Sequence, residues 1–147
     1  MAIQRMVVGT DGSVPAQRAV EWAAEVAAAV GAEVVAVHVM GMLEDLGDGT
    51  KVPAESVRDE VAVRLETEWC QPLRDRGVAF RGEIVPGNPV GVLLDVADRD
   101  DADLIVVGSR GIGGVSALHL GSTSHDLAAR SRRAVVIVPA EPGSPER

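Results

Sequence analysis

The strongest chemical signal in this sequence is a glycine-rich stretch, residues 108–123. It follows an apolar run, residues 104–107, which predicts a buried strand. Four glycines come first, and ten residues after Gly111 the pair Gly121 and Ser122 opens a predicted helix. Glycines let the backbone approach a ligand closely, and the unpaired amides of a helix start attract phosphate. A strand, a glycine loop and a helix start in this order predict an anion site.

A second turn-rich loop, residues 9–13, follows the first apolar run of the chain. Ser13 is a helix-capping residue and Pro15 fits a first helical turn, so a helix is expected from there to residue 30, where Gly31 ends it. Its expected buried stripe is Ala16, Ala19, Val20, Ala23, Ala27 and Val30. This loop therefore also joins a strand to a helix.

The remaining elements continue the alternation of strand and helix. The predicted strands are residues 3–8, 33–40, 78–85, 104–107 and 134–138, and the predicted helices span residues 14–30, 53–76, 89–97 and 122–130. Residues 41–52 are expected to be a mobile loop without regular structure, and Pro72 is expected to kink the second helix. Such alternation predicts an α/β fold with a parallel sheet covered by helices on both faces, and ligands in such folds bind beyond the carboxyl ends of the strands.

The spacing Gly108-x-x-Gly111, nine residues, then Gly121-Ser122 resembles the ATP-binding signature of the universal stress protein family. Residues 9–13, 37–39, 85–89 and 135–139 resemble other segments of the same family, so the likeness covers nearly the whole chain. The resemblance implies a five-stranded parallel sheet of order 3-2-1-4-5, Rossmann-like and similar to adenine nucleotide alpha hydrolases. It also implies one domain, residues 1–140, followed by a flexible tail, residues 141–147.

The resemblance further implies a nucleotide site at the exits of the first and fourth strands. Backbone amides of Gly108, Gly111, Gly121 and Ser122 would hold phosphates, with the Ser122 hydroxyl as a further donor, and the backbone at Val39 would meet adenine. The full implied set is Gly9, Thr10, Asp11, Val39, Gly108, Ser109, Arg110, Gly111, Gly121, Ser122 and Thr123.

Several of these residues also have ordinary structural interpretations. Asp11 either contacts ribose, or holds a water on magnesium, or bonds its own backbone in a turn. Arg110 either pairs with a phosphate oxygen or is a surface arginine. Ile112 and His119 depart from the family pattern, and the apolar Ile112 removes one phosphate contact. No protein ligand set for a metal is visible, so magnesium would be held only through water at Asp11.

Composition excludes several other classes of function. The net charge of −8 argues against nucleic acid as a partner. A single cysteine, Cys70, fits a reducing compartment and is expected to be a structural thiol. Without a leader or an apolar run of membrane-spanning length, the chain is expected to be cytoplasmic and not membrane-bound.

Three apparent constellations are expected to have no catalytic role. Residues 124–126 read Ser-His-Asp, but consecutive helical residues point about 100° apart and cannot form a triad. The acidic residues Asp98, Asp100, Asp101 and Asp103 are expected to form a solvated turn, and His38 is expected to be packed in the core.

The resulting hypothesis is an ATP-binding regulatory or stress-response protein with little or no hydrolysis. Lys51 is the only lysine and lies outside any phosphate-binding loop, and neither glycine loop offers a convincing base for fast cleavage. Two alternatives stay open: an adenylating or ATP-hydrolysing enzyme of the same fold, and a structural dimer module without nucleotide. An apolar edge strand formed by Val135, Val136, Ile137 and Val138 predicts a homodimer.

Overall fold

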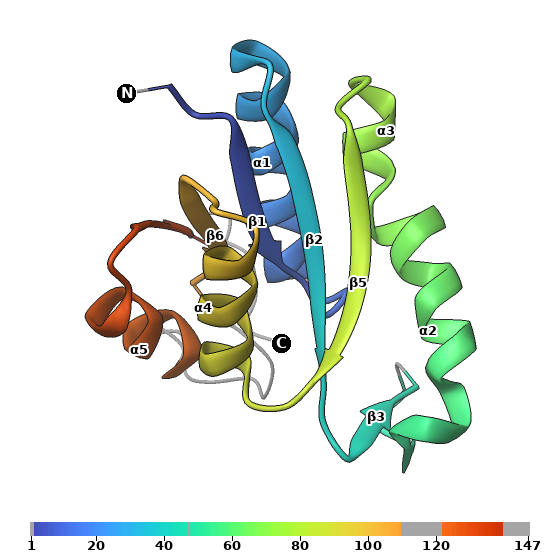
Figure 1. Ribbon diagram of the computed structural model, residues 1–147. Helices are drawn as coiled ribbons and strands as arrows, with labels where there is room; N and C mark the ends of the chain where they lie inside the picture. The colour runs from blue at the N-terminus through green and yellow to red at the C-terminus, as the bar shows by residue number, and fades with distance from the viewer. Residues whose placement is uncertain (1, 47, 110–121, 140–147) are drawn as a thin grey trace.

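The computed structural model describes residues 2–46, 48–109 and 122–139 (Figure 1). The elements, in chain order, are β1 (Arg5–Gly9), α1 (Val14–Val30), β2 (Glu33–Met40), β3 (Leu43–Asp45), β4 (Lys51–Pro53), the 3₁₀ turn η1 (Ala54–Val57), α2 (Arg58–Arg64), the π-helical turn η2 (Leu65–Trp69), α3 (Gln71–Asp75), β5 (Phe80–Pro86), α4 (Pro89–Arg99), β6 (Leu104–Gly108), α5 (Ser122–Arg130) and β7 (Ala134–Val138).

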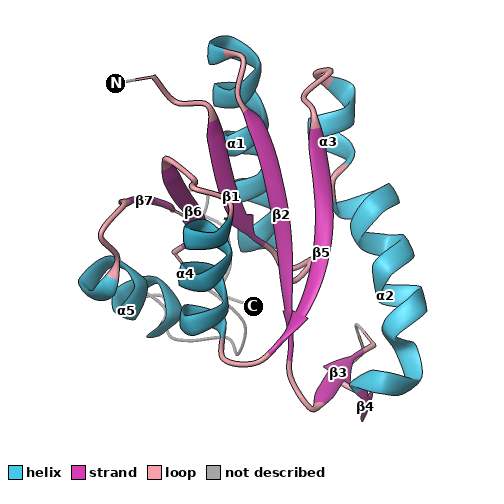
Figure 2. Cartoon of the chain, in the orientation of Figure 1, coloured by secondary structure: helices cyan, strands magenta, loops and turns pink. Residues whose placement is uncertain are grey.

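Five of the strands form one parallel sheet in the order β5-β2-β1-β6-β7 (Figure 2). Counting only these strands, this is the predicted order 3-2-1-4-5. The chain proceeds outward from β1 to β2 and β5, and then returns to place β6 on the other side of β1. The order therefore reverses between β1 and β6, which is where ligands bind in open parallel sheets.

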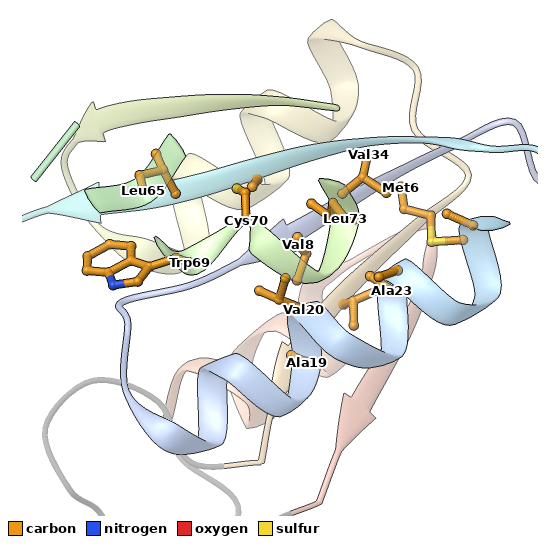
Figure 3. Close-up of a cluster of buried hydrophobic side chains, with 14 of the residues drawn as sticks. Met6, Val8, Ala19, Val20, Ala23, Val34, Leu65, Trp69, Cys70 and Leu73 are labelled. Atoms are coloured by element: carbon orange, nitrogen blue, oxygen red, sulfur yellow. The ribbon is translucent and has the colours of Figure 1, made fainter. Parts of the chain in front are cut away.

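Alternating side chains of the strands supply two separate cores. Met6 and Val8 point to the face covered by α1 and α3, where Leu65, Trp69, Cys70 and Leu73 also pack (Figure 3). Val7 points to the other face, which α4 and α5 cover. Because both faces are buried, the central strands β1, β2 and β6 are rich in valine, and their remaining buried residues are mostly other apolar side chains.

Helix α1 begins and ends as predicted. Ser13 Oγ accepts a hydrogen bond from Ala16 N at 3.4 Å, and Gly31 ends the helix in the left-handed region with a φ of +74°. The buried face of α1 is nearly all alanine and comprises Ala16, Ala19, Val20, Ala23, Ala24 and Ala27. Val30 was wrongly expected to be buried with this face: it is 50% exposed, because it is the last residue of the helix, directly before Gly31.

Residues 41–52 were wrongly predicted to lack regular structure. Strands β3 and β4 pair as an antiparallel hairpin, in which Glu44 lies opposite Val52. Leu46 N donates to Thr50 O at 3.0 Å, and Lys51 Nζ pairs with Asp45 Oδ2 at 3.2 Å. The hairpin lies beyond the end of β2 and leads into η1 (Figure 1).

The single long helix predicted for residues 53–76 is divided into η1, α2, η2 and α3. The break falls at Cys70, with φ −93° and ψ 7°, two residues before Pro72, which cannot donate to the preceding turn. Val61, Leu65 and Trp69 are nevertheless all buried, whereas Val57 is only partly buried.

The acidic residues before β6 are not a simple solvated turn. Asp103 Oδ2 accepts from the backbone amides of Gln4 at 2.7 Å and Arg5 at 3.0 Å, and these bonds hold the pKa of its carboxyl below the usual value. Asp98 pairs with Arg133, and Asp100 accepts from Arg99 Nη2 at 2.8 Å, which lowers the pKa of Asp100. The Asp101 side chain is 99% exposed, as expected of a solvated turn, although its Oδ1 lies 3.6 Å from Arg133 Nη2. These carboxylates tie β1, α4 and the segment before β7 together.

Candidate functional site

A pocket opens at the point where the order of the sheet reverses. It encloses about 460 Å³ of empty space, including the solvent at its mouth. Its described walls come from the exits of β1, β2 and β6 and from the first turns of α1, α4 and α5: Gly9, Thr10, Asp11, Ala16, Val37, Val39, Pro89, Leu93, Val107, Gly108, Thr123 and Ser124.

The loop after β1 is held in place by its own polar side chains. Thr10 N continues the strand pairing by donating to Val37 O at 2.9 Å, and Thr10 Oγ1 accepts from Gly12 N at 3.2 Å. Asp11 Oδ1 accepts from Ser13 N at 2.9 Å, which is the turn contact that an aspartate here makes without any ligand. Asp11 also lines the pocket, so its turn contact and a place on the pocket wall are compatible in one conformation.

The exit of β6 forms the wall opposite this loop. Gly108 ends β6 and lines the pocket, while Ser109 N donates to Val138 O at 2.8 Å and so continues the pairing with β7. The Ser109 amide is therefore already bonded in this structure. Ser124 Oγ lies 3.5 Å from Ser109 O and connects the start of α5 to the same exit.

The glycine-rich loop falls mostly outside the described residues. Arg110, Gly111 and Gly121 lie there, as do the departures Ile112 and His119. Ser122 is the first residue of α5, and Thr123 lines the pocket. Of the residues implied by the resemblance, the described structure brings together Gly9, Thr10, Asp11, Val39, Gly108 and Thr123.

Sequence reasoning missed the apolar part of the wall. Val37, Val107 and Leu93 line the pocket together with Val39, and they give it one side suited to a flat apolar group. In the sequence, Leu93 cannot be told from any other core residue of its helix. Ser124 was considered only as a member of a false triad, although it lies three residues before the fully buried Leu127 and so on the same face of α5.

Among the described residues that line the pocket, Asp11 is the only charged one. Among the described residues, no group of three or more histidine, cysteine, aspartate or glutamate side chains is arranged to hold a metal. The pocket can therefore offer a hydrogen-bonding loop, an apolar wall, a helix start and one carboxylate. This combination suits a nucleoside better than a bare anion.

Two polar core residues lie outside the pocket lining. His38 is buried, as predicted, but it also contacts Glu44 of the β3–β4 hairpin, which the sequence did not indicate. Cys70 is fully buried as the expected structural thiol, and burial raises its pKa to about 12.

His125 and Asp126 are exposed while Ser124 is buried, so the three do not converge. Within the described residues, no helix has the length and apolar character needed to cross a membrane.

The fold and pocket define an α/β protein with a five-stranded parallel sheet and a pocket at the reversal of its strand order, and comparison with known proteins gives the family. The model of the universal stress protein family matches residues 2–139. The chain is 31% identical to a universal stress protein of Thermus aquaticus, covering 90% of this chain and 96% of that one. It is 30% identical to Universal stress protein YxiE of Bacillus subtilis, covering 91% and 97%.

Solved structures agree with these sequence matches. A universal stress protein in complex with cAMP superposes with a TM-score of 0.73 at 31% identity, covering 95% of this chain and 98% of that chain. A universal stress protein from Archaeoglobus fulgidus in complex with dAMP gives a TM-score of 0.66 at 25% identity, covering 94% and 99%. The chain described here belongs to the universal stress protein family.

Proposed function

We propose that this chain binds an adenine nucleotide in the pocket between the exits of β1 and β6. The observation that carries the proposal is the lining itself, in which the polar loop of Thr10 and Asp11 faces the apolar Val39 and Val107 at the reversal of the sheet. The complexes of relatives with cAMP and dAMP support the choice of adenine.

The proposed roles follow the two sides of the pocket. The backbone at Val39 meets the adenine ring, and the loop of Gly9, Thr10 and Asp11 faces the ribose. The start of α5, with Ser122 and Thr123, holds phosphate together with the glycine loop, and that loop contributes Gly108, Ser109, Arg110, Gly111 and Gly121. The Ser109 contribution is from its side chain, because its amide is bonded to Val138.

ATP with magnesium is the proposed form of the ligand. Magnesium binds through few carboxylates, phosphate oxygens and several waters. Asp11, the one carboxylate in the described lining, fits this pattern through a bridging water. Magnesium would neutralise phosphate charge, which the uncharged remainder of the described lining does not do.

A regulatory role with little or no hydrolysis follows from the same lining. Fast phosphoryl transfer needs a group that positions the attacking water and strong positive charge at the transition state. Asp11 is the sole titratable group in the described lining, and one of its oxygens already accepts from Ser13 N. We therefore propose that this is a regulatory protein of the stress response and that its signal is whether a nucleotide is bound. We further propose that it is cytoplasmic and homodimeric, and that it consists of one domain, residues 1–140, followed by a flexible tail, residues 141–147.

The test is to identify the nucleotide that the protein holds. Denaturing the purified protein and analysing the released small molecules by mass spectrometry is expected to yield an adenine nucleotide, and calorimetry should show saturable binding of AMP, cAMP and ATP with or without magnesium. The double variant Gly111→Val with Gly121→Val should lose binding. Gly41→Val is the control, because a Cβ there meets nothing nearer than 4.0 Å.

Two outcomes would contradict the proposal. Absence of released nucleotide together with no binding heat at millimolar ligand would favour a structural module without nucleotide. A multiple-turnover ATPase or adenylation rate above about 1 per second would favour an enzyme.

A further inference from the structure

His38 connects two parts of the molecule that the chain separates. Its ring is 2% exposed, near the end of β2. Nδ1 lies 3.0 Å from Thr10 O, in the loop that lines the pocket, and Nε2 lies 2.6 Å from Glu44 Oε1, in the β3–β4 hairpin. The same imidazole therefore contacts the pocket loop with one nitrogen and the hairpin with the other.

Both partners of the ring are hydrogen-bond acceptors. A carbonyl oxygen accepts only, so Nδ1 must carry the proton that faces Thr10. The contact with Glu44 then needs a second proton, either on Nε2 or on the carboxyl, because two bare acceptors at 2.6 Å repel each other. The link is complete only when the imidazole and the carboxyl share that second proton.

The pocket loop rests on this link and on Trp69. The Trp69 ring meets the His38 ring edge to face, with centroids 5.3 Å apart, and the same indole fills the space beside Gly12. Thr10 thus contacts His38, and Gly12 lies against Trp69. His38 lies between Val37 and Val39 on β2, and since these two line the pocket, His38 points to the other face of the sheet.

The hairpin is held by pairing between its own two strands and by the start of η1, where Ala54 N donates to Met42 O at 2.9 Å. Glu44 pairs across the hairpin with Val52, and Asp45 pairs with Lys51. Met42 and Leu43 beside Glu44 are 91% and 58% exposed, so few apolar contacts hold this end of the hairpin. The buried contact of Glu44 with His38 is correspondingly important for its position.

We propose that His38 is a positioning residue that couples the β3–β4 hairpin to the nucleotide pocket. When Glu44 is in contact with the ring, Thr10 O and the loop are fixed in the form that lines the pocket. Coupling is reciprocal, so a ligand that stabilises the loop also stabilises the contact of the hairpin with His38. This proposal rests on the proposed function for its ligand, but the link between hairpin and loop exists without one.

Two variants of His38 separate its two contacts. The amide nitrogen of asparagine takes the place of Nδ1 and keeps the bond to Thr10 O, so His38→Asn loses only Glu44. The amide nitrogen of glutamine takes the place of Nε2, so His38→Gln loses only Thr10. Glu44→Ala removes the contact from the other side, and Asp45→Asn is the control, since it changes the hairpin away from His38.

The first measurement uses the protein without ligand. Amide hydrogen exchange of Gly12 and Ser13, whose N–H groups are bonded to Thr10 Oγ1 and Asp11 Oδ1, should be several-fold faster in Glu44→Ala and His38→Gln than in wild type or Asp45→Asn. Unchanged exchange in both variants overturns the coupling, whatever the protein binds.

The second measurement adds AMP and follows calorimetry together with exchange. AMP should slow exchange of hairpin amides in wild type, and Glu44→Ala should weaken AMP by roughly 3- to 10-fold although Glu44 does not line the pocket. In the His38→Asn background, Glu44→Ala should have no further effect. Wild type that binds AMP with an unchanged affinity in Glu44→Ala contradicts the coupling, whereas wild type that binds no nucleotide contradicts the proposed function alone.

Discussion

The indole of Trp69 occupies the space that a side chain on Gly12 would need. A Cβ atom on Gly12 would lie 2.3 Å from Trp69 Cε2, and the backbone there has a φ of +79°. The loop that lines the pocket thus lies against Trp69 of η2, which is 57 residues further along the chain than Gly12. The π-helical turn that ends at Trp69 is part of what shapes this loop.

Gly12→Ala is therefore expected to be costly. The positive φ and the overlap with the indole together should lower the free energy of unfolding by roughly 2–4 kcal/mol, and nucleotide affinity should fall as well. Denaturant unfolding and calorimetry measure the two effects. The control is Gly31→Ala, where φ is +74° but a Cβ meets nothing within 4 Å, so only the backbone cost of about 1 kcal/mol applies. An equal loss of free energy of unfolding in the two variants would show that the Trp69 indole moves aside at little cost.

Two variants of Asp11 separate its role in the turn from its proposed role in ligand binding. Asp11→Asn keeps an oxygen for Ser13 N, so stability should change by less than about 0.5 kcal/mol. Asp11→Ala loses that bond and should cost about 1 kcal/mol. Both should weaken the magnesium dependence of ATP binding, measured by calorimetry with and without magnesium. An aspartate needed only for the turn would leave ligand binding unchanged in Asp11→Asn.

Asp103 should make the fold sensitive to acid. Hydrogen bonds from the amides of Gln4 and Arg5 lower its pKa in the folded state, so the unfolded chain takes up this proton first as the pH falls. The stabilisation is complete above the ordinary aspartate pKa of about 3.9 and is lost as the pH falls through the lower native pKa. Asp103→Ala should cost roughly 1–2 kcal/mol near neutral pH and less near pH 3, as urea unfolding at both values would measure. A pH-independent difference would contradict this account.

Cys70 should be unreactive in the folded protein. Burial raises its pKa to about 12, so the thiolate that attacks alkylating reagents is scarce at neutral pH. Iodoacetamide should label the thiol at a rate set by unfolding, and label it rapidly in denaturant. Fast labelling of the native protein, followed by mass spectrometry, would indicate that η2 opens readily.

The exposed edge of the sheet should pair with a second copy of the chain. Strand β7 lies at the end of the sheet order, and Ala134 at its start is exposed. Sedimentation should show a dimer at micromolar concentration. Ala134→Lys should lower the dimer fraction, because charge on an edge strand opposes pairing, whereas Ala28→Lys on an exposed part of α1 should not. Monomer alone in the wild type would refute the prediction.

The elements with clear periodicity or end signals could be predicted from the sequence. Strands 33–40 and 134–138 and helix 122–130 have the predicted bounds, and Ser13 and Gly31 cap α1 as expected. Strands β3 and β4 were missed because three residues are too few to show alternation. The division of the helix at Cys70 could only partly be inferred from Pro72, since the π-helical turn before it leaves no sequence signal.

The polar half of the pocket was easier to predict than the rest. Glycine, threonine and aspartate after a strand mark a loop at a sheet exit, whereas Leu93 and Val107 look like any core residue until the topology brings them to the pocket. The contact of His38 with Glu44 depends on a hairpin that was not predicted. Six residues of separation along the chain gave no reason to pair them.

The alanine face of α1 leaves little freedom for change in the interior. Ala19 and Ala23 allow the helix to approach the strands closely, and a larger residue at either position would push the helix outward. Ser13, which caps the same helix, would move with it and shift the adjoining loop. A larger side chain on this face of α1 would need a smaller residue opposite it on β1 or β6. Substitutions in the core and substitutions in the pocket loop are therefore expected to occur together during evolution.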